Sequence, residues 1–204
     1  MRKKKKKKNV SRILLKTAFA SGLILLSVLL IMTLYSLFLE YGMNLMEEFR
    51  FILIGILIYF ALHLFVRRRP VIYIIGHELT HMIFVWLFHG WAWKLKIRKN
   101  QGSITASKDN LFISLAPYFF PLFTIFLLII YIFSITFVKN NLTFSILQTI
   151  IGITTGFHFL FTAEMILSQQ NDFNYLGRAL SVVLIISFNM LNCIMLLLIF
   201  SGLV

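Results

Sequence analysis

The chain has 204 residues, of which 59% are hydrophobic and 13% charged, and its formal net charge is +13. Soluble domains are about half apolar and about a quarter charged, so this composition excludes an ordinary soluble domain and indicates an integral membrane protein. Its basic residues cluster beside apolar stretches, which indicates topogenic charge and contact with a lipid bilayer, not nucleic-acid binding. A lone cysteine, Cys193, excludes a disulfide framework and a cysteine-based metal site.

Apolar segments along the chain predict an all-α polytopic membrane protein with about six transmembrane helices, located in the cell membrane. A helical span needs about 20 mostly apolar residues. The segments that reach or approach this length are 14–39, 50–66, 70–90, 111–138, 144–168 and 175–201. The unbroken lysine run Lys3–Lys8 predicts a disordered, basic cytoplasmic tail over residues 1–12. Pro117 and Pro121 predict a kink or a break in the fourth segment.

The third apolar segment contains the sequence His77-Glu78-Leu79-Thr80-His81. Residues four apart lie on one face of a helix, so His77 and His81 can hold one Zn²⁺ together. Glu78 is then placed to act as a catalytic base on a water held by the metal. Ionisable groups are costly inside a membrane, and their presence there indicates function by default. The sequence therefore predicts a catalytic zinc site on this helix.

The stretch 93–109 has a different pattern from the apolar segments. Trp93–Arg98 alternates apolar and basic residues with a period of two, Asn100-Gln101-Gly102 is typical of a turn, and Ser103–Ser107 can form a returning strand. This pattern predicts a short β-hairpin at the membrane surface, directly after the helix with the two histidines. An ordinary basic loop is the alternative interpretation.

A catalytic zinc ion usually has three protein ligands, so one more ligand is needed. We choose Asp172, which lies at a break between the fifth and sixth apolar segments. On a helical projection it falls within about 40° of three other polar residues, in a stripe that should face the protein interior. These residues are His158, Thr162 and Gln169. His158 is the main alternative ligand, and Glu164 and Asp109 are further alternatives.

Several polar residues in apolar segments are candidates for contacts with the substrate or around the metal. His158 and Thr162 are candidates for lining a path for water, and Gln169 belongs to the same stripe. Asn189 and Asn192 are three residues apart and share a helix face in the last segment. Hydrogen bonding between helices and positioning of the substrate are the two interpretations of this asparagine pair.

The stretch Gly76-His77-Glu78-Leu79-Thr80-His81 resembles the metal-binding helix of the site-2 protease family of intramembrane zinc metalloproteases. The basic stretch 93–109 resembles the β-hairpin that often follows this helix, and Asp172 resembles the distant aspartate ligand of the family. The resemblance covers about residues 70–200. It is to a minimal, divergent member, because Phe173 follows Asp172 where the family has glycine, and the Asn-x-x-Pro feature is missing.

The resemblance implies hydrolysis of peptide bonds in a membrane protein or membrane peptide. It implies a metalloprotease-like core over residues 70–204, preceded by two added transmembrane helices over residues 13–69. His77, His81 and Asp172 would hold Zn²⁺, and Glu78 would pass the water's proton to the leaving amine. The hairpin would pair with an extended substrate strand.

Two other functions are compatible with the same residues. The first is a non-catalytic, metal-binding membrane scaffold, and the second is a metal transporter. The topology also raises a conflict. The lysine run places the N-terminus in the cytoplasm, and counting helices from there places the basic hairpin on the opposite side of the membrane.

Overall fold

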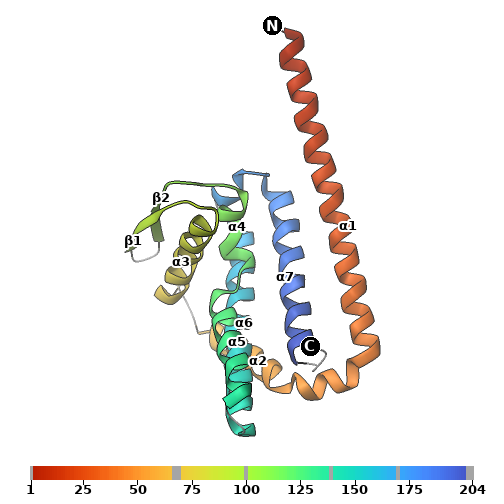
Figure 1. Ribbon diagram of the computed structural model, residues 1–204, viewed down its shortest axis with the longest axis vertical. Helices are drawn as coiled ribbons and strands as arrows, with labels where there is room; N and C mark the ends of the chain where they lie inside the picture. The colour runs from red at the N-terminus through yellow and green to blue at the C-terminus, as the bar shows by residue number, and fades with distance from the viewer. Residues whose placement is uncertain (1, 66–69, 99–100, 138–139, 169–170, 201–204) are drawn as a thin grey trace.

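The computed structural model describes residues 2–65, 70–98, 101–137, 140–168 and 171–200, which are mostly helical. Side chains of the first 16 residues and of several residues between 41 and 48 are not described. In chain order the elements are α1 (Arg2–Glu48), α2 (Arg50–His63), α3 (Val71–Leu87), β1 (Ala92–Arg98), β2 (Gln101–Ala106), α4 (Leu111–Phe119), α5 (Leu122–Phe137), α6 (Asn141–Leu167), the 3-10 helix η1 (Asn171–Asn174) and α7 (Arg178–Phe200) (Figure 1).

Three helices in the described part of the chain are long and apolar enough to cross a membrane: α1 over Thr17–Glu40, α6 and α7. A fourth span is formed if α4 and α5, which meet at an angle of 66°, count as one broken span. Helices α2 and α3 are apolar but have only 14 and 17 residues. At about 1.5 Å per residue, each is shorter than the hydrocarbon core of about 30 Å. Six transmembrane helices are therefore not confirmed.

The break between α4 and α5 confirms the effect predicted for the prolines. Helix α4 ends at Phe119 and α5 begins at Leu122, so that Pro121 lies at the break. A proline has no backbone N–H to donate, and its ring clashes with the preceding turn. Pro117 is tolerated inside α4, because the carbonyl oxygen of Ile113, which its missing N–H would have bonded, accepts a hydrogen bond from a histidine of α3.

Helix α1 begins at Arg2, so the backbone of the lysine run is helical where we expected a disordered tail. Lysine is a good helix former, and adding residues to an existing helix avoids the cost of starting a new one. Figure 1 shows this part of α1 projecting well beyond the remaining helices.

Both N-terminal helices pack against the C-terminal part of the chain. The Ser27 and Ser187 hydroxyl oxygens, on α1 and α7, lie 2.8 Å apart. Helix α2 packs closely on α6, and the approach depends on Gly55, Gly152 and Gly156. Small residues four apart allow such close helix contacts in membranes. The two N-terminal helices thus pack directly on helices that follow residue 70.

Replacing Gly152 with alanine is expected to destabilise the protein by about 1–3 kcal/mol, as overpacking does. The new Cβ would overlap the carbonyl oxygen of Ile52 and lie 2.9 Å from the Ile52 Cα, so backbone must move. This cost exceeds the helix preference of alanine over glycine, about 1 kcal/mol. Thermal unfolding in detergent measures the effect. Gly22→Ala is the control, because nothing lies within 4 Å of its Cβ position. Equal unfolding temperatures for both variants would contradict the contact.

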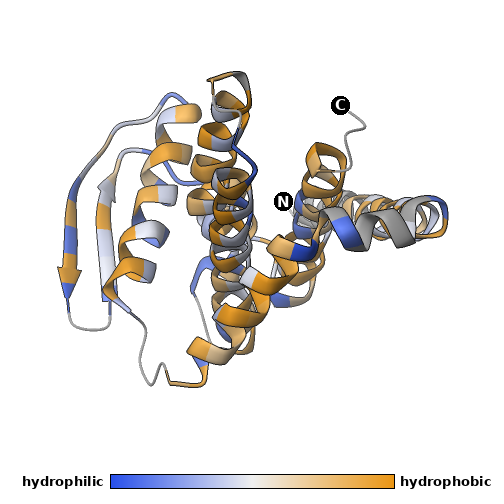
Figure 2. Ribbon diagram, turned by 90° about the horizontal axis from the view of Figure 1, so that it is seen from below, coloured by the Kyte–Doolittle hydropathy of each residue, from blue (hydrophilic) through white to orange (hydrophobic). Residues whose placement is uncertain are grey.

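The β-hairpin predicted after α3 is confirmed as a two-stranded antiparallel sheet. Ile97 pairs with Gly102 and Arg98 with Gln101, so Gln101 and Gly102 belong to a strand and not to the turn we predicted. Asn100, the remaining residue of that prediction, lies outside the described residues. In Figure 2 one strand alternates hydrophilic and hydrophobic residues, whereas the helices are mostly hydrophobic.

The hairpin lies toward the end of the molecule from which the N-terminal part of α1 projects (Figure 1). A core cluster supports this placement, because Leu23 of α1 packs there with Tyr118 of α4 and Phe173 of η1. Counting six full spans places the hairpin opposite the N-terminus, but only three or four spans are found in the described residues. The difference comes mainly from α2 and α3, which are apolar but shorter than the three helices long enough to span.

Candidate metal centre

Helix α3 presents its two histidines side by side. The Nε2 atoms of His77 and His81 lie 3.2 Å apart, and both side chains are partly buried. The helix is held close to α5 at Gly76, where an added Cβ would lie 2.6 Å from the Phe123 ring. The two histidines are neighbours because residues four apart lie on the same face of a regular helix.

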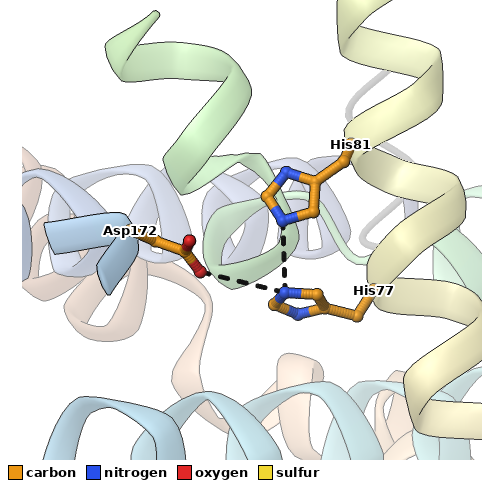
Figure 3. Close-up of side chains that lie close together, drawn as sticks. All are labelled: His77, His81 and Asp172. Atoms are coloured by element: carbon orange, nitrogen blue, oxygen red, sulfur yellow. Dashed lines mark hydrogen bonds and ion pairs between the residues drawn. The ribbon is translucent and has the colours of Figure 1, made fainter. Parts of the chain in front are cut away.

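Asp172 reaches the histidines from η1. Its Oδ2 atom lies 3.9 Å from Nε2 of His77. Candidate ligand atoms of His77, His81 and Asp172 all lie within 4.8 Å of one another. Figure 3 shows the three side chains converging from two separate elements. Within the described part of the chain, no other group of three His, Cys, Asp or Glu side chains is arranged in this way.

The three side chains fit a divalent metal ion. Two ligands about 2.0–2.1 Å from a tetrahedral ion lie about 3.3 Å apart, close to the 3.2 Å between the histidine nitrogens. The distance from His77 to Asp172 is somewhat longer, at 3.9 Å. Two imidazoles and a carboxylate suit zinc, and they also suit other transition metals. The arrangement thus fits a metal without identifying which one.

A backbone carbonyl orients the ring of His81. Its Nδ1 atom lies 2.8 Å from the carbonyl oxygen of Ile113, so Nδ1–H donates and Nε2 keeps its lone pair. This is the form in which a histidine binds metal, and such outer contacts are usual around metal ligands. The Ile113 oxygen is available because Pro117, four residues later, has no N–H.

Two tyrosines surround the other two side chains. The Tyr118 hydroxyl donates to Oδ2 of Asp172 over 2.5 Å. The same ring makes an edge contact with the His77 ring, with centroids 5.3 Å apart. The Tyr73 hydroxyl lies 3.4 Å from Nδ1 of His77. Aromatic side chains thus hold both His77 and Asp172 in place.

Glu78 lies beside the histidine pair and is buried, with 8% of its surface exposed. Strand β2 passes directly over its side chain. A Cβ at Gly102 would overlap the Glu78 Cγ atom and lie 2.6 Å from its Oε1 and 2.8 Å from its Cδ. Only a glycine at this position of the hairpin leaves room for the carboxylate where it now lies.

A cavity of about 860 Å³ adjoins these groups. Its walls come from α3, from strand β2 and the following loop, from α4, from Met165 of α6 and from η1, and they are largely polar. The residues around it include His77, Glu78, His81, Gly102, Ser103, Lys108, Asp109, Asn171 and Asp172. The candidate metal ligands and Glu78 therefore face one shared, largely polar cavity.

The other candidate ligands do not join the group of His77, His81 and Asp172. The His158 Nε2 atom lies 3.0 Å from the Asn189 side-chain oxygen, and Glu164 pairs with His63 at 2.8 Å. Asp109 lines the cavity but accepts from the Ser114 hydroxyl. It also accepts from Tyr175, and this hydrogen bond raises the pKa of the Tyr175 phenol. Of the four candidates, only Asp172 lies with the histidines.

The polar stripe predicted on the fifth segment does not extend to Asp172. Helix α6 ends at Leu167, so Asp172 lies on a separate short helix and not on the same helical face. His158 and Thr162 do not line the large cavity. His158 instead borders a small cavity of about 30 Å³ that His77 also lines. Gln169 lies outside the described residues.

The asparagines and Thr162 instead bind the backbone at the break after α4. The Tyr118 carbonyl accepts from Thr162 over 3.3 Å and from Asn189 over 2.9 Å. The Phe119 carbonyl accepts from Asn192 over 2.7 Å. These carbonyls lose their helical partners where the helix ends, so polar side chains of α6 and α7 satisfy them.

Sequence patterns missed the contributions of Tyr118, Gly102 and the Ile113 carbonyl. Pro117 was a usable signal for the carbonyl, because a proline within a helix always leaves one oxygen without its usual partner. Tyr118 and Gly102 had no comparable signal.

No protein-family model, no curated protein and no solved structure matches this chain.

Proposed function

We propose that the protein is a zinc-dependent intramembrane metalloprotease resembling the site-2 protease family. One observation carries the proposal: an aspartate from a distant part of the chain lies within 4.8 Å of the histidine pair on α3. Glu78, the residue between the histidines that such an enzyme needs as a base, borders the same cavity. If the two histidines had no function, neither a carboxylate nor a polar cavity would be expected beside them in a membrane protein.

In this proposal His77, His81 and Asp172 hold the ion. A bound zinc ion supplies Lewis acidity, which polarises the scissile carbonyl group and activates water. The Ile113 carbonyl keeps His81 in its metal-binding form, as the Nδ1 contact of 2.8 Å requires. Glu78 takes the proton from the attacking water and returns it to the nitrogen of the leaving amine.

The cavity favours an extended peptide as the substrate. A helix keeps its amide groups in internal hydrogen bonds, so a substrate helix must unwind before its carbonyl can be attacked. Gln101, Ser103 and Lys108 give the cavity polar walls that replace those hydrogen bonds. The lysine-rich end of α1 lies on the same side as the hairpin, and by the positive-inside rule this supports a cavity that faces the cytoplasm.

Metal analysis of the purified protein tests the proposal. We expect about one zinc ion per chain in the wild type and loss of zinc in His77→Ala. His89→Asn is the control, because it removes an exposed imidazole outside the site, and asparagine tolerates the positive φ of 58° there. A wild type without zinc after growth in metal-supplemented medium, or full zinc in His77→Ala, would refute the proposal.

The same preparations address the metal transporter. A transporter needs successive sites along a path, and the described residues provide one candidate group. Uptake of zinc by proteoliposomes would favour transport over proteolysis.

A further inference from the structure

Helix α4 supports both ends of the candidate metal centre. Its Ile113 carbonyl orients His81, and its Tyr118 hydroxyl bonds Asp172. We propose that Tyr118 is a positioning residue, which fixes the carboxylate of Asp172 for metal binding. The proposal rests on the function proposed above, since it assumes that Asp172 is a ligand.

The contact geometry points to this role. Tyr118 donates to the oxygen of Asp172 that faces His77, over 2.5 Å to Oδ2. Hydrogen bonds to an ionised acceptor are short and strong. A carboxylate oxygen has two lone pairs, so Oδ2 can accept a hydrogen bond from the phenol and still face the histidines. The phenol thus fixes the rotation of the carboxylate without blocking it.

Asp172 needs such support because of where it lies. Element η1 is a single turn of four residues, whereas the histidines lie on a helix of 17 residues. A side chain on so short an element gains little order from its own backbone. Phe173, the next residue, packs on the Tyr118 ring with centroids 5.2 Å apart. One tyrosine therefore holds both the carboxylate and the backbone next to it.

Tyr118 is itself held rigidly. Its side chain is fully buried, with 0% exposed. Asn189 of α7 donates to its carbonyl over 2.9 Å. The amide nitrogen of Asn189 is engaged there and at Ile185, so its oxygen accepts from Nε2 of His158 over 3.0 Å. His158 and Asn189, our candidates for contacts with the metal or the substrate, thus hold the Tyr118 backbone by hydrogen bonds. The Tyr118 hydroxyl in turn holds Asp172.

Zinc affinity measured against a competing chelator tests the proposal, on full-length protein in detergent. We expect Tyr118→Phe to weaken zinc binding by about 10- to 100-fold, as loss of an outer hydrogen bond to a ligand does. Tyr131→Phe is the matched control. It deletes the same atom from a buried tyrosine that bonds Gln148 far from the centre, and it should bind zinc like the wild type. Unfolding temperatures identify variants that fail to fold.

A double-mutant cycle with Asp172→Ala separates positioning from a general structural effect. If Tyr118 acts through Asp172, Tyr118→Phe causes no further loss of zinc affinity in the Asp172→Ala background. The visible spectrum of the Co²⁺-loaded protein should also change in Tyr118→Phe and not in Tyr131→Phe. Wild-type affinity in Tyr118→Phe, with weakened binding in Asp172→Ala, overturns the positioning role and leaves the ligand assignment intact. Wild-type affinity in Asp172→Ala overturns both.

Discussion

Replacing Glu78 with glutamine is expected to lower the rate of substrate cleavage by about 10²- to 10⁴-fold, the usual contribution of a catalytic base. Glutamine has nearly the shape of glutamate, but its amide cannot take a proton from water. The three candidate ligands are unchanged, so the variant should keep its zinc. Cleavage of a membrane-embedded reporter peptide in detergent or liposomes, together with metal analysis of the same sample, measures both quantities.

Glu164→Gln provides the matched control for this prediction. It makes the same change in a carboxylate that pairs with His63 and does not line the cavity, so cleavage should persist. Equal cleavage by wild type and Glu78→Gln would remove Glu78 from the mechanism. A cellular phenotype that survives Glu78→Gln while His77→Ala abolishes it would favour the non-catalytic scaffold.

Hydropathy predicted where the helices lie better than how many of them cross the membrane. Each predicted apolar segment contains a helix, and the prolines marked the break between α4 and α5. Hydropathy indicates that a segment is buried away from water, but it does not show whether lipid or protein surrounds it. Helix α2 has 14 residues, and its Gly55 packs against the protein surface of α6 and not against lipid. Its apolar sequence is therefore compatible with an incomplete crossing.

The candidate site shows the same division between local and long-range information. The distance between His77 and His81 follows from helix geometry, so the sequence was sufficient for that pair. Asp172 was selected partly through a helical stripe that the structure does not contain, because α6 ends at Leu167. Elimination among seven acidic residues was the sounder reason, since few carboxylates lie near apolar segments.

Tyr118 could not be selected from the sequence, because its role depends on a contact between distant elements. In an apolar run that also holds phenylalanines, a tyrosine is typical of packing, and its hydroxyl partner is a residue of η1. The asparagines Asn189 and Asn192 were noticed through their shared face, and one of our two interpretations, hydrogen bonding between helices, agrees with their contacts. Their partners depend on a helix break in another segment.

Gly102→Ala is expected to lower the cleavage rate on the order of 10²-fold, with the fold and the metal retained. The added Cβ would overlap Cγ of Glu78 and lie 2.6 Å from its Oε1 and 2.8 Å from its Cδ, so the side chain must move. All three atoms belong to one side chain that borders the cavity, so Glu78 can rotate toward the cavity without a shift of backbone. Displacing a catalytic group by about 1 Å can cost about 10²-fold in rate. The substitution therefore tests whether the rate depends on where the Glu78 carboxylate lies, because the carboxylate itself is retained.

The measurement for Gly102→Ala is cleavage of the same reporter, with zinc content and unfolding temperature as parallel readouts. Gly22→Ala adds the same methyl group where nothing lies within 4 Å, so its cleavage should match the wild type. Combining Gly102→Ala with Glu78→Gln adds a stringent check. If the glycine acts only by making room for the base, the double variant is no slower than Glu78→Gln alone. Wild-type cleavage by Gly102→Ala would mean that the hairpin does not rest on Glu78 when the substrate is bound.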